Sequence, residues 1–538
     1  MSLANFFGKN ALAAHQILGG MTPETFAGLL GARVVEIVFD TAAVASAEGR
    51  TTLELATNLA ARLYPRVRIR GLGGGAEVDV LAREMRGLAT AINPEIELLS
   101  PDGTGGIAVV VGSTQHPSVG DTQVFYAGSR GWCACFSPAA PVGSGATQNP
   151  MGAAAAACFA LANVFRAVFS PYLERAEPDN TFALSLLDYL PRDLDTGADH
   201  AGPALPEEGI DLGETMLAGV GAIGSAAVWA LARVPELRGK LHLIDPQTVA
   251  LSNLQRYVLA LQEHAAIALA KVDVAAAALS AGADSRRGSA LNVVPHRATW
   301  AGFLDARGDW TIGRVLTAFD TVEDRIAAQA ALPRRLLNAW TQLGNLGVSR
   351  HLSFGKTPCV ACLHRPRAGG KSEAELIGDA MGLPGTPEIV RELLHSGAPI
   401  GEEFIRGVAT RREIEDPDGL EVLLRFAPAS LRSFYSDAFC GGVILRLGGR
   451  TEGAAARAEA PMAFQSALAG VMLAAELVID VVGHRDPSRT VPSRVVIDLL
   501  RPLAPYLHEP ATRRTDGLCL CNDFDYLAAY AAKYTTGP

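Results

Sequence analysis

The sequence of 538 residues has few aromatic side chains, few cysteines and no long run of basic residues. Phe, Trp and Tyr make up 6% of the chain, and 8 cysteines are too few for a disulfide scaffold in a protein of this length. The formal net charge is −9, which excludes nucleic acid as the main partner because phosphate binding requires a concentrated basic surface. The low cysteine content favours a reducing compartment, and we expect the cytoplasm.

Two apolar stretches, 151–169 and 462–480, are long enough to raise the question of membrane insertion. Arg166 and Glu476 lie within them, and each stretch follows a proline, so we expect buried core helices and no membrane partner. The first twenty residues fit an amphipathic helix. They lack the basic segment, continuous apolar stretch and cleavage site of a secretory signal.

Small and aliphatic residues are abundant instead. The chain is 49% hydrophobic with 55 glycines and many Ala-rich stretches, a mix typical of layered α/β proteins. The length exceeds the size at which one hydrophobic core keeps growing, so two or three domains are expected. The predicted class is therefore an α/β enzyme.

The first predicted domain comprises residues 1–195 and ends in a polar, Pro/Gly/Asp-rich linker at 191–209. The glycines of GLGGG at 71–75 are not followed by a recognisable phosphate-binding helix, so no nucleotide site is predicted here. The strand and helix patterns of this domain lie at 33–39, 107–112, 151–169 and 182–187.

The second predicted domain begins with a strand at 215–220, a glycine-rich turn, a helix and a strand at 240–245, which form a βαβ unit. Later, RVLTAFD at 314–320 predicts another buried strand, and VVIDLL follows the helix 462–480. The same helix-then-strand order closes the first domain, which indicates an internal duplication. The predicted parts are 210–365 for the first portion of this domain, 366–450 for a helical insertion and 451–538 for the remainder.

The chemistry begins at the glycine-rich turn AGVGAIGS. Gly219, Gly221 and Gly224 lie between a strand and a helix, where glycine permits a tight turn and close approach to phosphate. Asp245 ends the next strand and can accept hydrogen bonds from ribose hydroxyls. These two features fit a dinucleotide dehydrogenase as well as an ATP-binding enzyme.

The next segment, DPQTVALSNLQRY, separates these alternatives. Its run Ser252, Asn253, Leu254, Gln255, Arg256 resembles the ThiF/MoeB-type adenylating superfamily, which includes the ubiquitin-activating enzymes. The resemblance implies that Asn253 and Arg256 contact ATP phosphates, and a guanidinium suits a polyphosphate because it offers several donors in a fixed fork.

The resemblance extends to two further positions. Lys271 matches the family lysine that reaches the phosphates, and Asp320 matches the acid that holds Mg²⁺, with Arg325 at the family spacing after it. Thr321 stands where the family usually has Asn, while Glu323 and Asp324 can also be read as acids at the start of a helix. The implied ATP-binding set is Gly219, Gly221, Gly224, Asp245, Asn253, Arg256, Lys271 and Asp320.

Two short cysteine pairs predict a structural Zn²⁺ site. Cys359 and Cys362 form CxxC, and Cys519 and Cys521 form CxC near the C-terminus. Four thiolates suit a closed tetrahedral site. Because CxC is a less usual spacing, His364 stays open as a replacement ligand.

Cys440, in SDAFCGG, lies where the family places its thioester-forming or sulfur-handling cysteine. A thiolate is the right nucleophile for an acyl adenylate, and the adjacent glycines leave room for a peptide tail. An inert buried cysteine is the alternative. Cys133, Cys135 and Cys158 are interpreted as structural.

The resemblance thus implies two Rossmann-like ThiF-type adenylation folds, one inactive and one active, with an inserted, mainly helical catalytic-cysteine region. It implies ATP-dependent adenylation of a ubiquitin-like protein, a thioester on Cys440 and transfer to a conjugating enzyme. The layout is similar to activating enzymes of bacterial ubiquitin-like conjugation operons, whose implied role is antiphage defence.

Three alternatives remain open from the sequence. A sulfur-carrier adenylyltransferase would use the same ATP site, although such enzymes are usually shorter. An NAD-dependent dehydrogenase would share only the glycine turn and Asp245, and a catalytically dead scaffold would not need Arg256, Lys271 or Asp320. The sequence leaves open which ubiquitin-like protein is used, and whether a homodimer forms beyond the internal pseudo-dimer.

Overall fold

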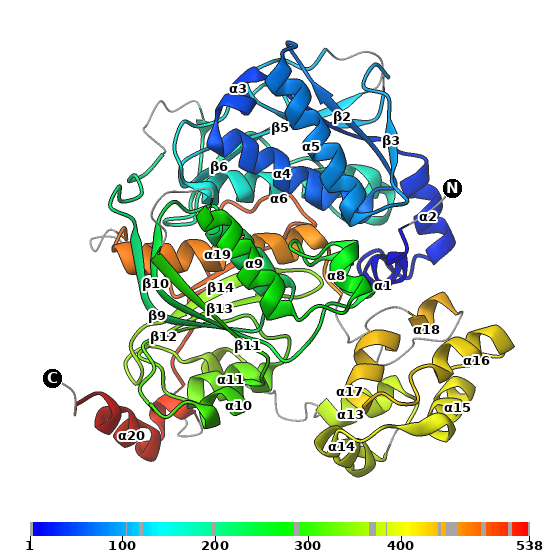
Figure 1. The fold of residues 1–538 in the computed structure, drawn as a ribbon, viewed down its shortest axis with the longest axis vertical. Coiled ribbons are helices and arrows are strands. Elements are labelled where there is room, and N and C mark those ends of the chain that lie inside the picture. Colours follow the sequence, from blue (N-terminus) through cyan, green and yellow to red (C-terminus); the bar gives the residue numbers. More distant parts are fainter. Residues whose placement is uncertain are drawn as a thin grey trace. The chain divides into compact units, whose positions relative to one another are not determined.

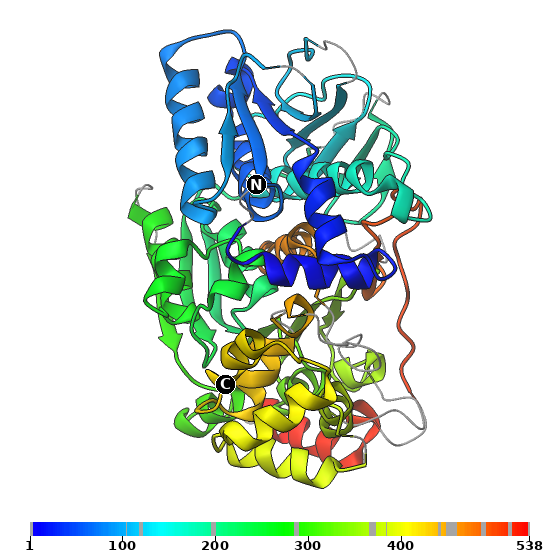
Figure 2. The same cartoon turned by 90° about the vertical axis from the view of Figure 1, so that its right-hand side faces the viewer.

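A computed structural model describes the protein in two compact units (Figures 1 and 2). Unit 1 comprises residues 1–4, 30–365 and 463–538, and unit 2 comprises residues 5–29 and 366–462. The residues described are 4–103, 105–117, 122–194, 201–284, 290–364, 373–383, 385–439, 443–447, 460–485, 491–514 and 519–535.

The first half of unit 1 contains an eight-stranded sheet with the order β3-β2-β1-β4-β5-β6-β7-β8. The strands from β3 to β5 in this sheet order are mutually parallel. Each of the next three, β6, β7 and β8, is antiparallel to the strand before it. The strands are β1 (Val35–Phe39), β2 (Arg66–Gly71), β3 (Glu97–Leu99), β4 (Ile107–Val111), β5 (Gln123–Arg130), β6 (Cys133–Ser137), β7 (Phe182–Ser185) and β8 (Pro191–Arg192). The main helices are α3 (Thr41–Ala45), α4 (Ala47–Leu63), α5 (Ala76–Ile92) and α6 (Pro150–Val168).

The second half contains a seven-stranded sheet with the order β11-β10-β9-β12-β13-β14-β15. The first five strands in this order are mutually parallel. The last two are joined by antiparallel pairings, of β14 with β13 and of β15 with β14. The strands are β9 (Ile210–Ala218), β10 (Leu237–Ile244), β11 (Ala290–His296), β12 (Arg314–Thr317), β13 (Arg335–Thr341), β14 (Leu346–His351) and β15 (Arg494–Ile497). Helices α7 (Ala222–Leu231), α9 (Lys271–Asp284), α10 (Trp300–Ala306), α11 (Val322–Ala330) and α19 (Ala463–Val482) connect them.

The two sheets share one topology. If β9 is aligned with β1, the seven strands of the second sheet follow the order and direction of the first seven strands of the first sheet. The long helix before the last aligned strand also corresponds, since α6 precedes β7 and α19 precedes β15. This agreement confirms the predicted α/β class and supports the internal duplication.

Helices α6 and α19 form the centre of unit 1, where they pack against each other between the two sheets (Figure 1). Both are long and apolar enough to span a membrane by composition, but nearly all of their residues are buried inside the protein. The predicted core helices at 151–169 and 462–480 are therefore confirmed.

Buried charges join the two halves as well. Glu476 on α19 accepts hydrogen bonds from Arg350 (2.6 Å), Arg485 (2.8 Å) and the Tyr189 hydroxyl (2.8 Å). Burial alone would raise the pKa of Glu476, yet Arg350 and Arg485 hold it below its usual value. Removing Glu476 would leave both arginines without their carboxylate, and the loss of a buried charge partner in this way is strongly destabilising.

Unit 2 is mainly helical, as predicted for the insertion. Its helices, coloured from yellow-green to orange in Figure 2, enclose a core of residues such as Val390, Ile405, Val408 and Phe434. They are α13 (Glu373–Ala380), α14 (Pro387–Ser396), α15 (Gly401–Arg411), α16 (Pro417–Leu424), α17 (Leu431–Phe434) and α18 (Val443–Arg446), joined by α1 (Phe7–Ile17) and α2 (Pro23–Gly31).

Residues 5–29, which the sequence analysis placed in the first domain, belong to this second unit. Helix α1 packs against α18, and the Gln16 side chain accepts a hydrogen bond from the Ala460 amide (3.0 Å). The linker also begins differently from the prediction, because Pro191–Arg192 forms β8. The 17-residue helix α5 follows Gly75 of GLGGG directly, and the expectation that no phosphate binds at these glycines stays a prediction.

Candidate nucleotide site and cysteine centre

Two of the three glycines in the turn after β9 have no room for a side chain. Gly219 has φ of +91°, and a Cβ there would lie 2.8 Å from the Ala318 carbonyl oxygen. A Cβ on Gly224 would lie 2.1 Å from the Gly219 carbonyl oxygen. Gly221 precedes the first residue of α7, so the amides that open this helix face the turn. Gly219 and Gly224 are thus required by the backbone geometry, whereas a Cβ on Gly221 would make only an ordinary contact, 3.4 Å from the Tyr257 hydroxyl.

Asp245 follows β10 and is 7% exposed. One carboxylate oxygen accepts a hydrogen bond from the Val220 amide (2.9 Å) and the other from the Gln247 amide (2.8 Å). Each oxygen can accept a further hydrogen bond, so the carboxylate can hold the turn and still receive a ribose hydroxyl.

The SNLQR run forms a short 3-10 helix, Leu251–Gln255. The Asn253 side-chain oxygen accepts a hydrogen bond from the Ala250 amide (2.9 Å), so this residue shapes the loop. In Arg256, Nε and Nη1 are buried and have no hydrogen-bond partner among the described residues. Two donors of one guanidinium are therefore available to bind an anion such as a phosphate.

Lys271 is the first residue of α9 and is 4% exposed. Its Nζ donates to Gln247 Oε1 (2.5 Å) and to the Tyr257 hydroxyl (3.0 Å). Burial alone would lower the pKa of Lys271, but Tyr257, Asp245 and Asp320 favour the charged form and raise it above its usual value. The ammonium group therefore carries its charge beside the glycine turn.

Asp320 is exposed, just beyond the end of β12. Arg325 is buried and donates to the Phe319 carbonyl next to Asp320 and to Asn338 Oδ1 (2.7 Å). Burial lowers the pKa of Arg325 to about 10. Thr321, which stands where the family usually has Asn, caps α11 by accepting from the Asp324 amide (3.1 Å). Arg325 and Thr321 thus fix the backbone on both sides of the candidate magnesium acid.

The structure brings the sequence-predicted residues to one edge of the second sheet. Strands β9, β10 and β12 are parallel, so the turn and acids that follow them share the carboxyl edge. Lys271 and Arg256 approach this edge from the connection after β10. The sequence did not predict Tyr257 and Gln247, which accept hydrogen bonds from the Lys271 ammonium. No residue spacing distinguishes them from ordinary loop residues.

In the first half, a carboxylate directly follows the strand equivalent to β9. Asp40 follows β1, the strand equivalent to β9, and accepts hydrogen bonds from the amides of Ala43 (2.9 Å), Ser113 (2.7 Å) and Thr114 (2.8 Å). A Cβ on Gly112 would lie 2.1 Å from an Asp40 carboxylate oxygen, so the space is closed. The amides at this edge of the first sheet thus donate to a carboxylate of the protein itself.

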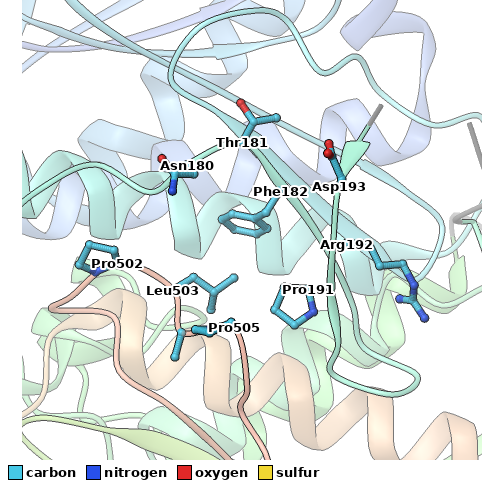
Figure 3. Close-up of a pocket in the computed structure, with 10 residues that line it drawn as sticks. Asn180, Thr181, Phe182, Pro191, Arg192, Asp193, Pro502, Leu503 and Pro505 are labelled. Atoms are coloured by element: carbon cyan, nitrogen blue, oxygen red, sulfur yellow. The ribbon is translucent and has the colours of Figure 1, made fainter. Parts of the chain in front are cut away.

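A groove of about 580 Å³ lies in unit 1 between the β7–β8 hairpin and the segment that follows β15 (Figure 3). Phe182 and Pro191 line one side, and Pro502, Leu503 and Pro505 line the other. The Leu503 amide donates to Asp179 (2.6 Å) and anchors the second wall. Strand β14 is antiparallel to both β13 and β15, so β15 runs in the same direction as β13. The chain therefore leaves β15 at the carboxyl edge of the sheet, where Asp320 lies, and then forms the second wall of the groove.

The four paired cysteines converge in one buried cluster. All four sulfur atoms lie within 4.8 Å of one another, and the separations of Cys519 from Cys359, Cys362 and Cys521 are 3.3, 3.2 and 3.8 Å. A tetrahedral Zn²⁺ with bonds of about 2.3 Å requires sulfur separations of about 3.8 Å, so the cluster fits this geometry after small adjustments of the side chains. The proximity of Cys362 and burial raise the pKa of Cys359, and a cation is needed to hold four thiolates in this space.

Among the described residues, Cys133, Cys135, Cys158 and His364 lie outside this cluster. His364 is not among the four residues that converge, and burial lowers its pKa to about 3. Burial raises the pKa of Cys133 to about 11 and that of Cys135 to about 12, and Cys158 is buried as well. Cys440 lies outside the described residues, directly after the π-helical turn Tyr435–Phe439.

Comparison with known proteins gives matches for both halves. Residues 208–521 match the family model described as ThiF family, and residues 38–170 match the one described as Prokaryotic E2 family C. The uncharacterized protein y4jF of Sinorhizobium fredii is 43% identical over 535 residues, which cover 99% of this chain and 98% of that protein.

Solved structures are more distant. E. coli MccB crystallised with ATP is 14% identical, with a TM-score of 0.32, and the match covers 58% of this chain and 67% of that chain. E. coli tRNA N6-threonylcarbamoyladenosine dehydratase, TcdA, is 22% identical with a TM-score of 0.19, over 24% of this chain and 53% of that chain. Similarities of this size carry no argument about activity.

Proposed function

The chain belongs to the ThiF family, and we propose that it activates the C-terminus of a ubiquitin-like protein by adenylation. One observation carries the proposal. At the glycine turn, two buried nitrogens of Arg256 have no hydrogen-bond partner among the described residues, and Lys271 is held in its charged form beside Asp245 and Asp320. Two cations and two acids around a phosphate-binding turn suit a magnesium nucleotide.

In the proposed reaction, a carboxylate oxygen of the carrier tail attacks the α-phosphorus of ATP. The bond from this phosphorus to the bridging oxygen breaks, and pyrophosphate leaves with the electron pair. Arg256 and Lys271 neutralise the phosphates, the amides at the start of α7 bind phosphate oxygens, and Asp245 orients the ribose. Asp320 would hold Mg²⁺, which supplies charge neutralisation at the phosphates when bound.

The groove between Phe182 and Leu503 is proposed to receive the carrier tail. It is lined mainly by apolar side chains, and one of its walls leaves the sheet at the edge that carries Asp320. An extended tail can lie in such a groove with its C-terminal carboxylate directed along the sheet edge.

The second proposed step takes place on Cys440. Its thiolate attacks the acyl carbon of the adenylate, the thioester bond forms and AMP leaves with the oxygen. The carrier then passes to a cysteine of a conjugating partner. Cys440 follows a π-helical turn, a type of turn found frequently at functional sites.

The conjugating partner is proposed to be a separate protein. Although residues 38–170 match a prokaryotic E2 family, the cysteines of this region are Cys133, Cys135 and Cys158, and all three are buried. Burial raises their pKa values, which is the opposite of what a thioester-carrying cysteine requires. Together with the Asp40 carboxylate, which binds the amides of Ala43, Ser113 and Thr114, this supports an inactive adenylation half whose work is structural.

A structural Zn²⁺ is proposed to bind the four converging cysteines, Cys359, Cys362, Cys519 and Cys521. The closed set of four sulfur ligands leaves no open position for substrate. The metal would tie the chain before α20 (Phe524–Thr535) to the segment after β14.

Two assays test the proposal with a candidate ubiquitin-like protein. Carrier-dependent exchange of labelled pyrophosphate into ATP is expected in the wild type and lost in Lys271→Met. On a non-reducing gel, an ATP-dependent, thiol-labile adduct is expected in the wild type and in the control Cys158→Ala, but not in Cys440→Ser. Exchange without any Cys440-dependent adduct would favour a sulfur-carrier adenylyltransferase instead, and absence of exchange with carriers that bind the protein would overturn adenylation.

A further inference from the structure

Arg62 lies on α4 in the first half, yet its guanidinium binds the second half. The residue is 0% exposed. It donates from Nη1 to the Leu254 carbonyl (2.6 Å) and from Nη2 to the carbonyls of Val258 (3.1 Å) and Ala260 (3.0 Å). One side chain thus gathers three backbone carbonyls from a single loop of the other half.

Asn58, one turn earlier on α4, completes the arrangement. Its side-chain oxygen accepts from Arg62 Nε (2.8 Å), and its amide nitrogen donates to the Val258 carbonyl (3.0 Å). The planar guanidinium is therefore fixed in orientation by its own helix and presents its remaining donors in a rigid fork.

The loop that is held carries the proposed phosphate-binding groups. Arg256 and Tyr257 lie between Leu254 and Val258, whose carbonyls bind Arg62. The Tyr257 hydroxyl accepts from Lys271, so the same loop also positions the buried ammonium. A guanidinium this deeply buried is costly unless its donors are satisfied, which ties α4 firmly to residues 254–260.

We propose that Arg62, supported by Asn58, is a positioning residue that holds the 254–260 loop in its nucleotide-binding conformation. The first half then strengthens ATP binding by ordering this loop, without contacting the nucleotide. This inference rests on the proposed function for its ATP readout, whereas the ordering of the loop can be measured without nucleotide.

Other contacts between the halves provide the control. The Tyr189 hydroxyl donates to Glu476 (2.8 Å), and this bond is buried and joins the halves but does not involve residues 254–260. Tyr189→Phe therefore removes an inter-half hydrogen bond of similar burial. A general weakening of the interface would affect this variant and Arg62→Met alike.

The experiment uses the full chain and compares the wild type, Arg62→Met, Arg62→Lys and Tyr189→Phe. Hydrogen exchange of amides in 251–260 is measured without nucleotide, and binding of a fluorescent ATP analogue is measured at a temperature where all variants are folded. We expect Arg62→Met to speed exchange in this loop and to weaken binding about tenfold, the change produced if the competent loop conformation falls to about a tenth of the population. Arg62→Lys should restore part of both, and Tyr189→Phe should change neither.

Two results would overturn the inference: unchanged exchange in 251–260 in Arg62→Met, or equal changes in Arg62→Met and Tyr189→Phe. If the wild type binds no ATP analogue, the proposed function fails. In that case the hydrogen-exchange comparison alone decides whether Arg62 orders the loop.

Discussion

Replacing Gly224 with alanine should disable the phosphate-binding turn, because the added methyl group has no space. The new Cβ would lie 2.1 Å from the Gly219 carbonyl oxygen, whereas ordinary van der Waals contact begins at 3.4 Å. The atom it meets belongs to the backbone, so no side-chain rotation relieves the overlap. Helix α7 and the turn must therefore separate by more than about 1 Å.

This displacement is large compared with the tolerance of a hydrogen bond. Amide nitrogens bind acceptors at about 2.9 Å, and a shift of about 1 Å breaks the contact. Each hydrogen bond from an amide to a charged phosphate contributes about 1.5–3 kcal/mol. Losing one of them raises the Kd for ATP by about ten- to a hundredfold. The crowded core should also reduce the free energy of unfolding by about 1–3 kcal/mol.

Gly87→Ala is the matched control, because Gly87 lies within helix α5 and a Cβ there meets no atom within 4 Å. Alanine is favoured over glycine in a helix by about 0.5–1 kcal/mol, so this variant should be slightly more stable and should bind ATP normally. Fluorescence titration with an ATP analogue and chemical denaturation measure both effects. If Gly224→Ala bound ATP with wild-type affinity, the assignment of this turn to the phosphates would be refuted.

Three further substitutions test Arg256 as a phosphate-binding residue, the cysteine centre as a zinc site and the groove as the site of the carrier tail. Arg256→Gln should weaken ATP binding about tenfold or more in calorimetry with little change in thermal midpoint, because two of its donors have no partner among the described residues. A large fall in stability with normal binding would show a structural role. Cys519→Ser should remove zinc, measured as one equivalent per chain in the wild type by elemental analysis, and lower the thermal midpoint; equal stability with and without a chelator would argue against the site. Leu503→Asp should impair carrier-dependent pyrophosphate exchange while leaving ATP affinity unchanged, and a normal KM for the carrier would exclude the groove as its tail site.

The parts of the fold that the sequence predicted are those governed by local pattern. The glycine spacing of AGVGAIGS fixes a turn in which Gly219 and Gly224 have no space for a side chain, and buried strands such as 107–112 appear as continuous aliphatic runs. Cys359 and Cys519 are far apart in the chain, but thiol pairs at short spacing have few chemical uses, so their convergence was predictable.

Contacts between distant segments could not be predicted in this way. Arg62 is separated from Leu254 by 192 positions, and an arginine in a helix is ordinarily read as a solvated residue. Asp40 looks like a helix-capping acid, and only the sheet order shows that it follows the strand equivalent to β9. Residues 5–29 were assigned by proximity in the chain, whereas packing of α1 against α18 places them with the insertion.

The most direct test of the central claim is a calorimetric titration of the full chain with Mg·ATP and, separately, with NAD. Asp245 and the glycine turn would accept either nucleotide, but Arg256 and Lys271 are arranged for a polyphosphate. The account predicts one bound ATP per chain, lost in Lys271→Met, and no measurable binding of NAD. Binding of NAD with no binding of ATP would contradict it.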